Sequence, residues 1–578
     1  MKQMLLRGLL LLLCGLLLLP TLAGCRGGQS DPEHTEGGSG AGSDTDPAES
    51  LPPEEPDNPG EILIAEDGVV HYRVIYPDDG GSLFYDFANS IAETIQNQVN
   101  ASARVQKESV SQIAQEQPAI YVGSTEALRK TGLDENLGYG DYRIAAVGED
   151  IYIAAYSYAA LDEAVEHFNR RIRNGLDGGS IYLRNYAREE TVSEELNGIP
   201  LISGELTAWG YTVGEEGSCE VVAANAAETD FEGYLASLAA LSYTEAARRS
   251  TDTGEYATYV GQEQALYVSL CGGELRVARE PVATAFLPAA GEQDFERRCD
   301  TVGYLMGVYG GGAYENGMSL FFLLADGTFL IYDGGHNESD ADQLYRTLSE
   351  VAGENGLDGI RISAWIITHS HSDHVGMFPS FLRKYGGRVR LETVFLNRTS
   401  AEQGSAAADM AAAEQTVVDA VQTYSTSTAI RRLQTGQEFW LADVRVEVLY
   451  TAADLRQGSL SDYNDANTVT RLTVNGKTVL ITGDAAAGAW GTMVGRYGTA
   501  LKSDILQVPH HGAAPGGTVE AYDLIDPDVL LWPAGDTLYA ALLASMNPGP
   551  CQHLVNMVSA ENIHIAGVLG RVTPFRFD

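Results

Sequence analysis

The segment Thr368-His369-Ser370-His371-Ser372-Asp373-His374-Val375-Gly376 decides the fold and the chemistry expected of this chain. It directly follows residues 360–367, a β-branched and aromatic run that predicts a buried strand, so the segment lies on the loop leaving that strand. Imidazole nitrogen and carboxylate oxygen together suit zinc, with manganese and iron as alternatives. The segment is therefore predicted to bind metal through four side chains, those of His369, His371, Asp373 and His374.

A second histidine-rich segment, Val508-Pro509-His510-His511-Gly512, ends another apolar run that begins at Asp504. The two segments contain five of the eleven histidines, which histidines scattered over polar loops would not explain. Between them, Asn475-Gly476 separates two alternating runs and predicts a tight hairpin. The second strand of this hairpin ends at Thr482-Gly483-Asp484, so Asp484 is a candidate to bridge two cations.

A further hairpin is predicted upstream at residues 320–324 and 329–332, and it ends in Asp333. In this order, the segments resemble the metallo-β-lactamase superfamily over residues 300–578, about half of the chain. Within it, the sequence is most similar to the branch that holds the hydrolase domain of competence DNA-uptake proteins and the phosphocholine esterases of teichoic acid. That branch has an asparagine near the start of the strand leading to Thr-Gly-Asp, as Asn464 and Asn467 do here.

The resemblance implies a C-terminal αββα metallo-β-lactamase fold in an α/β chain, and a site with two divalent ions, zinc first. It implies that His369, His371 and Asp484 hold one ion, and that the other is held by Asp373, His374, Asp484 and His511. Two such ions can lower the pKa of a shared water from 15.7 to about 7 and supply a bridging hydroxide. The catalytic candidates are His510, as a hydrogen-bond or proton donor, and Asp373. The roles of His510 and His511 can also be exchanged.

Two departures from the family pattern bear on activity. Ala513-Ala514-Pro515 replaces the serine that usually follows His-His-Gly, and no histidine occurs between His374 and His510. The third histidine of the first metal site is thus missing. By resemblance, Asp333 orients a ligand histidine, and Asn467 has a supporting role. Candidates for the missing ligand are, with the best placed first, His336, His553 and His564.

Three function classes follow. The favoured class is a metal-dependent phosphodiesterase that acts on an envelope or extracellular substrate, phosphodiester or glycan-linked. The alternative, from another class, is a surface binding lipoprotein with a weakened or inactive hydrolase domain. The missing third histidine and the altered residues after His-His-Gly favour it. A lactam or ester hydrolase is the third, since a fold does not determine an activity.

The N-terminus predicts export and a membrane anchor. Lys2 and Arg7 precede a leucine-rich core that is too short for a confident membrane span. The core ends in Leu22-Ala23-Gly24-Cys25, which resembles the bacterial lipobox, so residues 1–25 are a lipoprotein signal peptide with Cys25 as lipidated residue. An uncleaved anchor helix is the alternative. Residues 26–60 are acidic and rich in Gly, Ser and Pro, which predicts a disordered tether.

Composition narrows the partners. The formal net charge of −42 argues against nucleic acid, whose phosphates are bound mainly by Lys and Arg. An acidic surface is typical of a soluble exported protein. Beyond Cys14 and Cys25, four cysteines remain, and none forms a Cys-x-x-Cys pair, so a cysteine metal site is not expected. The pairing of these four stays open.

Two small domains are predicted between the tether and the hydrolase domain. Residues 61–197 alternate strands and helices, beginning with a strand at 69–76, and indicate a small α/β domain. Residues 198–299 indicate a small α+β domain, with a helix around Phe231 and strands at 256–260, 265–270 and 274–278. Neither contains a cluster of carboxylates and histidines, so the chemistry is assigned to residues 300–578.

Overall fold

The computed structural model describes residues 61–577, without residues 79–80, 112–116, 185–188, 192–195, 197, 203–206, 213–217, 290, 309–315, 400–406, 456–459, 461 and 545–548. The predicted signal peptide, Cys25 and the tether lie outside the described residues. Within the described part, no helix combines the length and the apolar character needed to cross a membrane.

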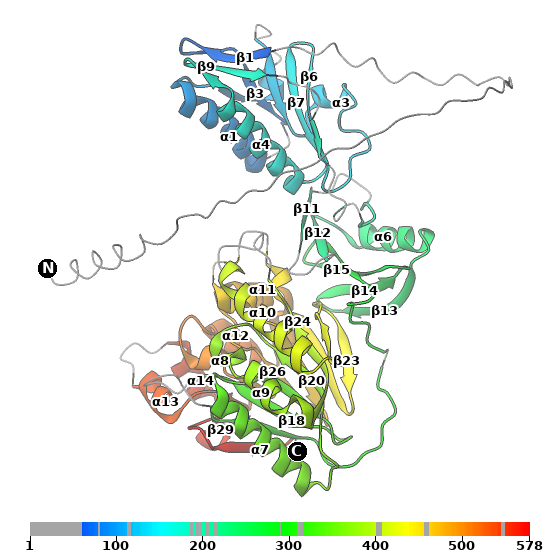
Figure 1. The fold of residues 1–578 in the computed structure, drawn as a ribbon, viewed down its shortest axis with the longest axis vertical. Helices are drawn as coiled ribbons and strands as arrows, with labels where there is room; N and C mark the ends of the chain where they lie inside the picture. The colour runs from blue at the N-terminus through cyan, green and yellow to red at the C-terminus, as the bar shows by residue number, and fades with distance from the viewer. Residues whose placement is uncertain are drawn as a thin grey trace, which may run out of the picture. The chain divides into compact units, whose positions relative to one another are not determined.

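Two seven-stranded sheets form the C-terminal region (Figure 1). The first has the order β22-β21-β20-β19-β18-β17-β30, and its strands in chain order are β17 Val302–Met306, β18 Ser319–Leu323, β19 Phe329–Asp333, β20 Ile360–Ile367, β21 Val389–Leu396, β22 Ala429–Arg431 and β30 Val572–Phe575. In the second sheet the strands lie side by side in chain order from β23 to β29. They are β23 Glu438–Leu441, β24 Val444–Tyr450, β25 Val469–Val474, β26 Lys477–Ile481, β27 Ile505–Gln507, β28 Val529–Trp532 and β29 Ile563–Ile565.

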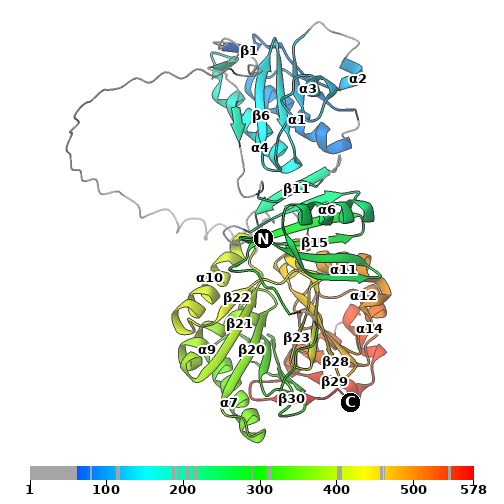
Figure 2. The same ribbon diagram turned by 90° about the vertical axis from the view of Figure 1, so that its right-hand side faces the viewer.

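The core lies between these sheets and beneath helices on their outer faces. Alternate residues of β18 point to opposite sides: Leu320 and Phe322 pack against residues of the second sheet, whereas Phe321 packs under the helices. The first sheet is covered by α7 Glu338–Glu354, α9 Phe378–Tyr385 and α10 Ala407–Tyr424. The second is covered by α11 Ala487–Tyr497, α12 Val519–Ile525 and α14 Pro550–Met557. Figure 2 shows these two groups on opposite sides, so the predicted αββα architecture is confirmed.

Strand direction brings the predicted motifs to the ends of the central strands. The two predicted hairpins are present, because β18 pairs antiparallel with β19 and β25 with β26. β19, β20 and β21 are parallel, and so are β26, β27 and β28. Parallel strands end at the same edge of a sheet. The loops after β19, β20, β26 and β27 therefore collect the polar motifs at these edges.

The strand predicted at residues 69–76 is wrong as one element. It is divided into β2 Val69–Val70 and β3 Arg73–Tyr76, which belong to different sheets. The backbone N–H of His71 donates to Ile64 O beside β1 Glu61–Glu66, whereas that of Arg73 donates to Pro118 O beside β5 Ala119–Val122. A run of apolar residues looks the same in sequence whether it forms one strand or two short strands that pair with different neighbours.

The N-terminal region contains a six-stranded sheet of order β10-β6-β7-β5-β3-β4 and a four-stranded sheet of order β2-β1-β9-β8. Their other strands are β4 Arg104–Lys107, β6 Tyr142–Val147, β7 Asp150–Ala155, β8 Leu176–Asp177, β9 Ser180–Arg184 and β10 Glu189–Thr191. The helices α1 Gly81–Val99 and α4 Tyr158–Asn174 bury Ile91, Ile95, Val165 and Phe168 in the core of this region. Two short helices are also present, α2 Glu108–Ser111 and α3 Glu126–Arg129.

A fifth sheet, which is antiparallel throughout, has the order β11-β12-β16-β15-β14-β13 and packs under α6 Glu228–Ala240. Its strands are β11 Thr207–Thr212, β12 Cys219–Ala224, β13 Thr244–Thr251, β14 Gly254–Val260, β15 Gln264–Cys271 and β16 Glu274–Pro281. The three strands predicted here correspond to β14, β15 and β16. The edge strand β13 was not predictable from apolar alternation, because most of its side chains are polar and exposed. The domain boundaries stay predictions.

Candidate metal centre

The cluster begins on the loop after β20. His369 and His371 lie in an extended segment, and the chain then turns into the short helix α8 Ser372–Val375, which contains Asp373 and His374. Asp484 follows β26, and His511 lies in the turn η6 Pro509–Gly512 after β27. The segments that follow three strands, β20, β26 and β27, thus supply all the ligand-type side chains, and two of these side chains lie on the short helix α8.

Four side chains form the first group, which we call cluster A: Asp373, His374, Asp484 and His511. Their ligand atoms all lie within 4.8 Å of one another, and all four residues are buried or nearly so. Asp484 Oδ2 lies 3.1 Å from His374 Nε2 and 3.2 Å from His511 Nε2. Asp373 Oδ2 lies 3.0 Å from His511 Nε2. Two carboxylates and two imidazoles therefore face one small volume.

The second group, cluster B, consists of His369, His371 and Asp484. His369 Nε2 lies 3.0 Å from His371 Nδ1 and 3.9 Å from Asp484 Oδ2. Asp484 belongs to both clusters, so its carboxylate is the link between two candidate cation positions. Among the described residues, cluster B contains no third histidine.

Hydrogen bonds orient the ligand-type side chains. The Nδ1–H of His374 donates to Asp333 Oδ2 at 2.7 Å, and Asp333 also accepts bonds from the N–H and hydroxyl of Thr368. The Nδ1–H of His511 donates to Pro533 O at 2.8 Å. Asn467 Oδ1 accepts the backbone N–H of Asp484 at 3.0 Å. In both histidines this places the lone pair on Nε2, which faces Asp484.

Backbone conformation at the centre is unusual. Gly483 has φ of +53°, and a Cβ at this position would lie 2.1 Å from Asn467 Oδ1, so only glycine fits between Thr482 and Asp484. Asp333, His510 and His511 also have positive φ, at 52°, 50° and 54°. Such conformations in non-glycine residues concentrate at functional sites.

Burial and neighbouring charges set the protonation of the centre. Burial and the nearby His374 lower the pKa of His369 well below its usual range, and they also lower that of His371, so both imidazoles are neutral and can act as ligands. Burial opposes ionisation of Asp484, but the neighbouring His374 and His511 hold its pKa well below the usual range. Burial opposes protonation of His511, yet Asp484 and Asp373 raise its pKa to about 10. The two carboxylates of cluster A therefore favour a positive charge beside them, held as a proton on His511 when no cation is bound; a bound cation would take the place of that proton and meet the lone pair on Nε2.

The residues fit a bound cation. His374 Nε2, His511 Nε2 and Asp484 Oδ1 are buried and make no hydrogen bond. Buried polar atoms are normally hydrogen-bonded, and leaving them unpaired is costly. Lone pairs that converge from two imidazoles and a carboxylate are what a divalent cation of the zinc, manganese or iron type would accept.

The other predicted site residues lie outside clusters A and B. His510 is outside both of them, and its buried Nδ1 makes no hydrogen bond. His336 is also outside, because its Nε2 donates to Asn316 O at 2.8 Å. His553 pairs with Asp523 at the surface at 2.6 Å, and His564 is half-buried in β29. Asp333 and Asn467 contact cluster residues, as described above.

Three neighbours of the centre were missed in the sequence. Asn316 donates from Nδ2 to Asp373 Oδ2 at 2.9 Å. The ring of Tyr463 packs edge-on against His371, with centroids 5.1 Å apart. Glu414, on α10, accepts bonds from Ser370 and Thr399, and burial raises its pKa to about 6. For Asn316 and Tyr463 the sequence contained a weak signal, because each lies close to a residue typical of a tight turn or of the site, Gly317 and Asn467 respectively. For Glu414 it contained none, because a glutamate in a helix is usually a surface residue.

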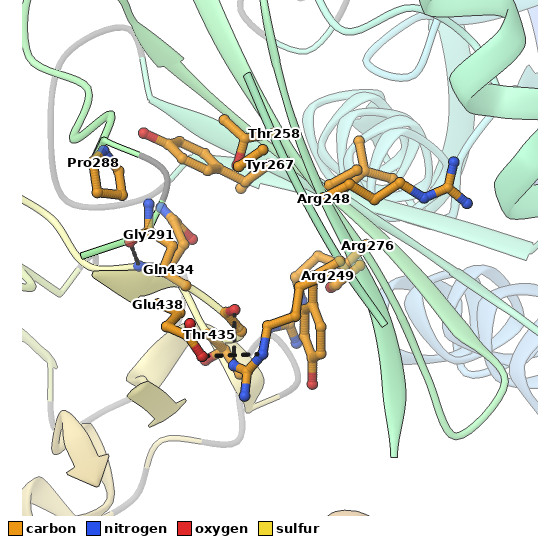
Figure 3. A pocket seen from close by; sticks show the side chains of 18 residues that line it. Arg248, Arg249, Thr258, Tyr267, Arg276, Pro288, Gly291, Gln434, Thr435 and Glu438 are labelled. Atoms are coloured by element: carbon orange, nitrogen blue, oxygen red, sulfur yellow. Dashed lines mark hydrogen bonds and ion pairs between the residues drawn. The ribbon is translucent and has the colours of Figure 1, made fainter. Parts of the chain in front are cut away.

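A separate hollow of about 230 Å³ lies between the sheet containing β13–β16 and residues 434–438 (Figure 3). Arg249 projects into it, but pairs with Glu438 at 3.6 Å and also with Glu447. Arg276 pairs with Asp454 at 2.8 Å, and Arg248 points away from the hollow and pairs with Glu232. Because all three arginines are engaged in ion pairs, we assign no ligand-binding or catalytic role to the hollow.

Metal removal is expected to lower the melting temperature. A ligand that binds only the folded state stabilises it by about 2.7 kcal/mol at one hundred times its Kd. For a domain of this size, this corresponds to a fall in Tm of roughly 5–10 °C on chelation. Differential scanning fluorimetry with chelator, followed by added zinc or manganese, measures the fall and its reversal. An unchanged Tm in both steps would contradict a cation held by clusters A and B.

A family model and several solved structures resemble part of the chain. Residues 315–531 match the family model of the metallo-beta-lactamase superfamily. The metallo-beta-lactamase fold protein YhfI from Bacillus subtilis is 16% identical with a TM-score of 0.30, over 48% of this chain and 100% of that one. CmlA, a diiron beta-hydroxylase from Streptomyces venezuelae, is 14% identical with a TM-score of 0.28, over 52% of this chain and 55% of that one.

A metallo-beta-lactamase from Cronobacter sakazakii is 16% identical with a TM-score of 0.23, over 42% of this chain and 87% of that one. No curated protein matches the chain. At these identities the likeness to solved structures concerns the fold alone. The family model, together with the αββα layers, establishes that this chain contains a metallo-beta-lactamase superfamily domain at residues 315–531.

Proposed function

We propose that this protein is a metal-dependent hydrolase that cleaves phosphodiesters of the cell envelope or of extracellular polymers. The observation that carries the proposal is the convergence of clusters A and B on one shared carboxylate, Asp484, beside buried nitrogen and oxygen atoms that make no hydrogen bond. Superfamily members are generally metal-dependent hydrolases, and the finer assignment rests on the motifs described above.

The residues in and around the clusters would have different roles in such a hydrolase. Divalent cations held by the clusters would supply Lewis acidity and lower the pKa of a coordinated water. Asp484 would be shared by the two cation positions, while Asp333 and Asn467 hold His374 and Asp484 in orientation. His510 has a buried Nδ1 without a hydrogen bond, so it is available to donate to a substrate oxygen or to protonate the leaving group.

The choice of phosphodiesters rests on three features. The order of Thr482-Gly483-Asp484 and His510-His511-Gly512 resembles that of the phosphocholine esterase branch. Export and a lipid on Cys25 would place the protein among envelope polymers. The net charge of −42 does not favour nucleic acid as the substrate.

The direct test is turnover by the chain from about residue 60, loaded with zinc or manganese. Elemental analysis should find close to two ions per chain, and bis(p-nitrophenyl) phosphate or p-nitrophenyl phosphorylcholine should be hydrolysed. Single-stranded DNA and nitrocefin belong in the same panel. Turnover of nitrocefin without phosphodiester turnover would replace the proposal with a lactam hydrolase, and absence of bound metal after loading would reject the metal-dependent hydrolase itself.

His510→Gln is expected to lower kcat by about 10²- to 10³-fold, because one hydrogen-bonding or proton-donating group at the reacting atoms is lost. The bound metal should stay at the wild-type level, since His510 lies outside clusters A and B. Steady-state kinetics and elemental analysis measure the two quantities. The matched control is His553→Gln, whose exposed ring pairs only with Asp523 among the described residues and should leave both unchanged. Loss of metal from His510→Gln would instead assign His510 as a ligand.

Cys25→Ser is expected to leave the precursor unprocessed and unlabelled. The lipid is attached to the cysteine thiol, so serine at this position removes the acceptor. Labelling cells with a fatty-acid probe and following precursor size measures both effects, and Cys14→Ser is the control within the same leader. Equal labelling of the Cys25→Ser variant and the wild type would overturn the lipoprotein assignment.

One observation favours a second function, that of a surface binding lipoprotein. Cluster B contains no third histidine among the described residues, and the ring of Tyr463 packs against His371. A weakened cluster B would bind metal poorly and could leave the protein without turnover. Metal-loaded protein that is inactive on the whole substrate panel would support this function over hydrolysis.

A further inference from the structure

The segment Asn316–Met318 lies against Asp373 of cluster A. The side-chain amide of Asn316 donates to Asp373 Oδ2 at 2.9 Å, and the backbone N–H of Met318 donates to Asp373 O at 3.1 Å. Asp373 is 57 residues away in sequence. The segment therefore holds both the carboxylate and the backbone of one ligand-type residue.

A second set of contacts holds Asn316 itself. His336 Nε2–H donates to Asn316 O at 2.8 Å, and the backbone N–H of His336 donates to Asp340 Oδ2 at 2.8 Å. Asn316 also forms an isolated antiparallel bridge with Ala534, which follows β28. The backbone of Asn316 is thus held from two sides, by His336 after β19 and by Ala534 after β28, and this fixes the position of its side-chain amide.

The packing leaves little freedom at this point. Gly317 has φ of +132°, and a Cβ there would lie 2.8 Å from Val308 Cγ2 and 2.9 Å from Asp373 O. The backbone can pass this close to Asp373 only because residue 317 is glycine. Asn316 is consequently presented to the carboxylate by a closely packed backbone.

We propose that Asn316 is a positioning residue that fixes the carboxylate of Asp373, so that cluster A is preformed for its cation. The hydrogen bond from the Asn316 amide goes to Oδ2, the same oxygen that lies 3.0 Å from His511 Nε2, and it restrains rotation of the carboxylate that faces cluster A. His336 acts through Asn316, which gives this histidine a role other than that of a metal ligand. The inference rests on the proposed function in one respect, namely that clusters A and B bind cations.

The test compares the wild type with Asn316→Ala and with Asn316→Asp, which keeps the shape but replaces the donor with a carboxylate. Groups that orient a ligand typically contribute 10- to 100-fold in metal affinity. We therefore expect one zinc equivalent to bind as in the wild type and the other to bind 10- to 100-fold more weakly in both variants. Calorimetric titration and elemental analysis after dialysis measure this.

A spectroscopic measurement separates positioning from general structural damage. When the Asn316 variants are titrated with cobalt, the visible absorption due to the first equivalent should appear as in the wild type. The absorption due to the second equivalent should appear only at a higher cobalt concentration. The control is Asn355→Ala, which also loses a side-chain amide donor, here to Val351 O within α7, and should bind both equivalents normally. If Asn316→Ala does not fold, the isosteric Asn316→Asp variant carries the test.

The outcomes distinguish the inference from the proposed function. If the wild type binds no cation, the proposed function fails. If the wild type binds two and both Asn316 variants bind two with unchanged affinity, only the inference is overturned. Equal weakening of both equivalents also overturns it, because a positioning role at Asp373 affects cluster A selectively.

Discussion

Asp484→Asn is expected to abolish hydrolysis and to remove most of the bound metal. Asp484 is the one residue shared by clusters A and B, and its Oδ2 lies within 3.9 Å of His369, His374 and His511. An asparagine keeps the shape but removes the negative charge that both cation positions share. Since groups that only orient a ligand contribute 10- to 100-fold, loss of this shared ligand should lower kcat/KM by more than about 10³-fold.

The measurement is kcat/KM on bis(p-nitrophenyl) phosphate together with metal content per chain. Asp526→Asn is the matched control: Asp526 ends α12 in a left-handed conformation that asparagine tolerates, and its exposed carboxylate pairs with Lys502 at 2.8 Å. Both quantities should stay within about twofold of the wild type in this control, as expected for a weak surface pair. An Asp484→Asn protein that retains two ions and full turnover would rule out the shared-ligand arrangement.

Asp454→Asn is expected to cause the largest loss of stability. The Asp454 side chain is 1% exposed and lies 2.8 Å from Arg276 Nη1 and 2.9 Å from Arg496 Nη1. Arg276 belongs to β16 and Arg496 to α11, so this carboxylate joins the sheet of β11–β16 to the metallo-beta-lactamase domain. Removing its charge takes the nearest carboxylate from the buried guanidinium groups of Arg276 and Arg496, although Arg276 keeps Glu220 at 3.9 Å. Loss of one partner from a buried ion pair typically costs about 3–5 kcal/mol. The expected fall in Tm is roughly 6–20 °C.

The effect should depend on pH in a defined direction. Burial opposes ionisation of Asp454, but Arg496 and Arg276 hold its pKa below the ordinary value of 3.8. A carboxyl whose pKa is lower in the folded state stabilises the fold above its unfolded pKa, and this contribution is lost as pH falls through the folded pKa. The difference in Tm between wild type and Asp454→Asn should therefore be full at neutral pH and shrink below pH 3.8.

Thermal melts of both proteins from neutral pH down to acid test this. The control is Glu232→Gln, because Glu232 is 46% exposed and forms a surface pair with Arg248. Such pairs contribute about 0–1 kcal/mol, so its Tm should change by only a few degrees. A wild-type Tm for Asp454→Asn at neutral pH would show that the carboxylate is not needed to neutralise the two arginines.

Much of the αββα region could be predicted because its signals are local. Alternation of apolar residues predicted β25 and β26, and Asn475-Gly476 predicted their turn, where both residues have positive φ, at 48° and 80°. The side chains of clusters A and B were all named in advance, since each directly follows a buried strand. Their types and spacing are properties of short segments, which is why they could be recognised.

Contacts between distant segments could not be predicted in this way. The bond between Asn316 and Asp373 spans 57 residues, and the pair of Arg276 and Asp454 spans 178. The break between β2 and β3 and the polar edge strand β13 were missed for the same reason, because each depends on which strand pairs with which. Partner choice is decided by the packing of the whole sheet and leaves little trace in local periodicity.

The sequence by itself therefore determined the class of the fold, the side chains able to bind metal and the strand ends that carry them. Only the tertiary structure decided that His511 rather than His510 lies in cluster A, that His336 supports Asn316, and that Asp454 pairs with arginines of both β16 and α11. The physical reason is that the type of ligand and the pattern of a strand depend only on a few neighbouring residues. The direction of a side chain depends on backbone conformation and on contacts made by residues far apart in the chain, such as the left-handed turn at His510 and His511.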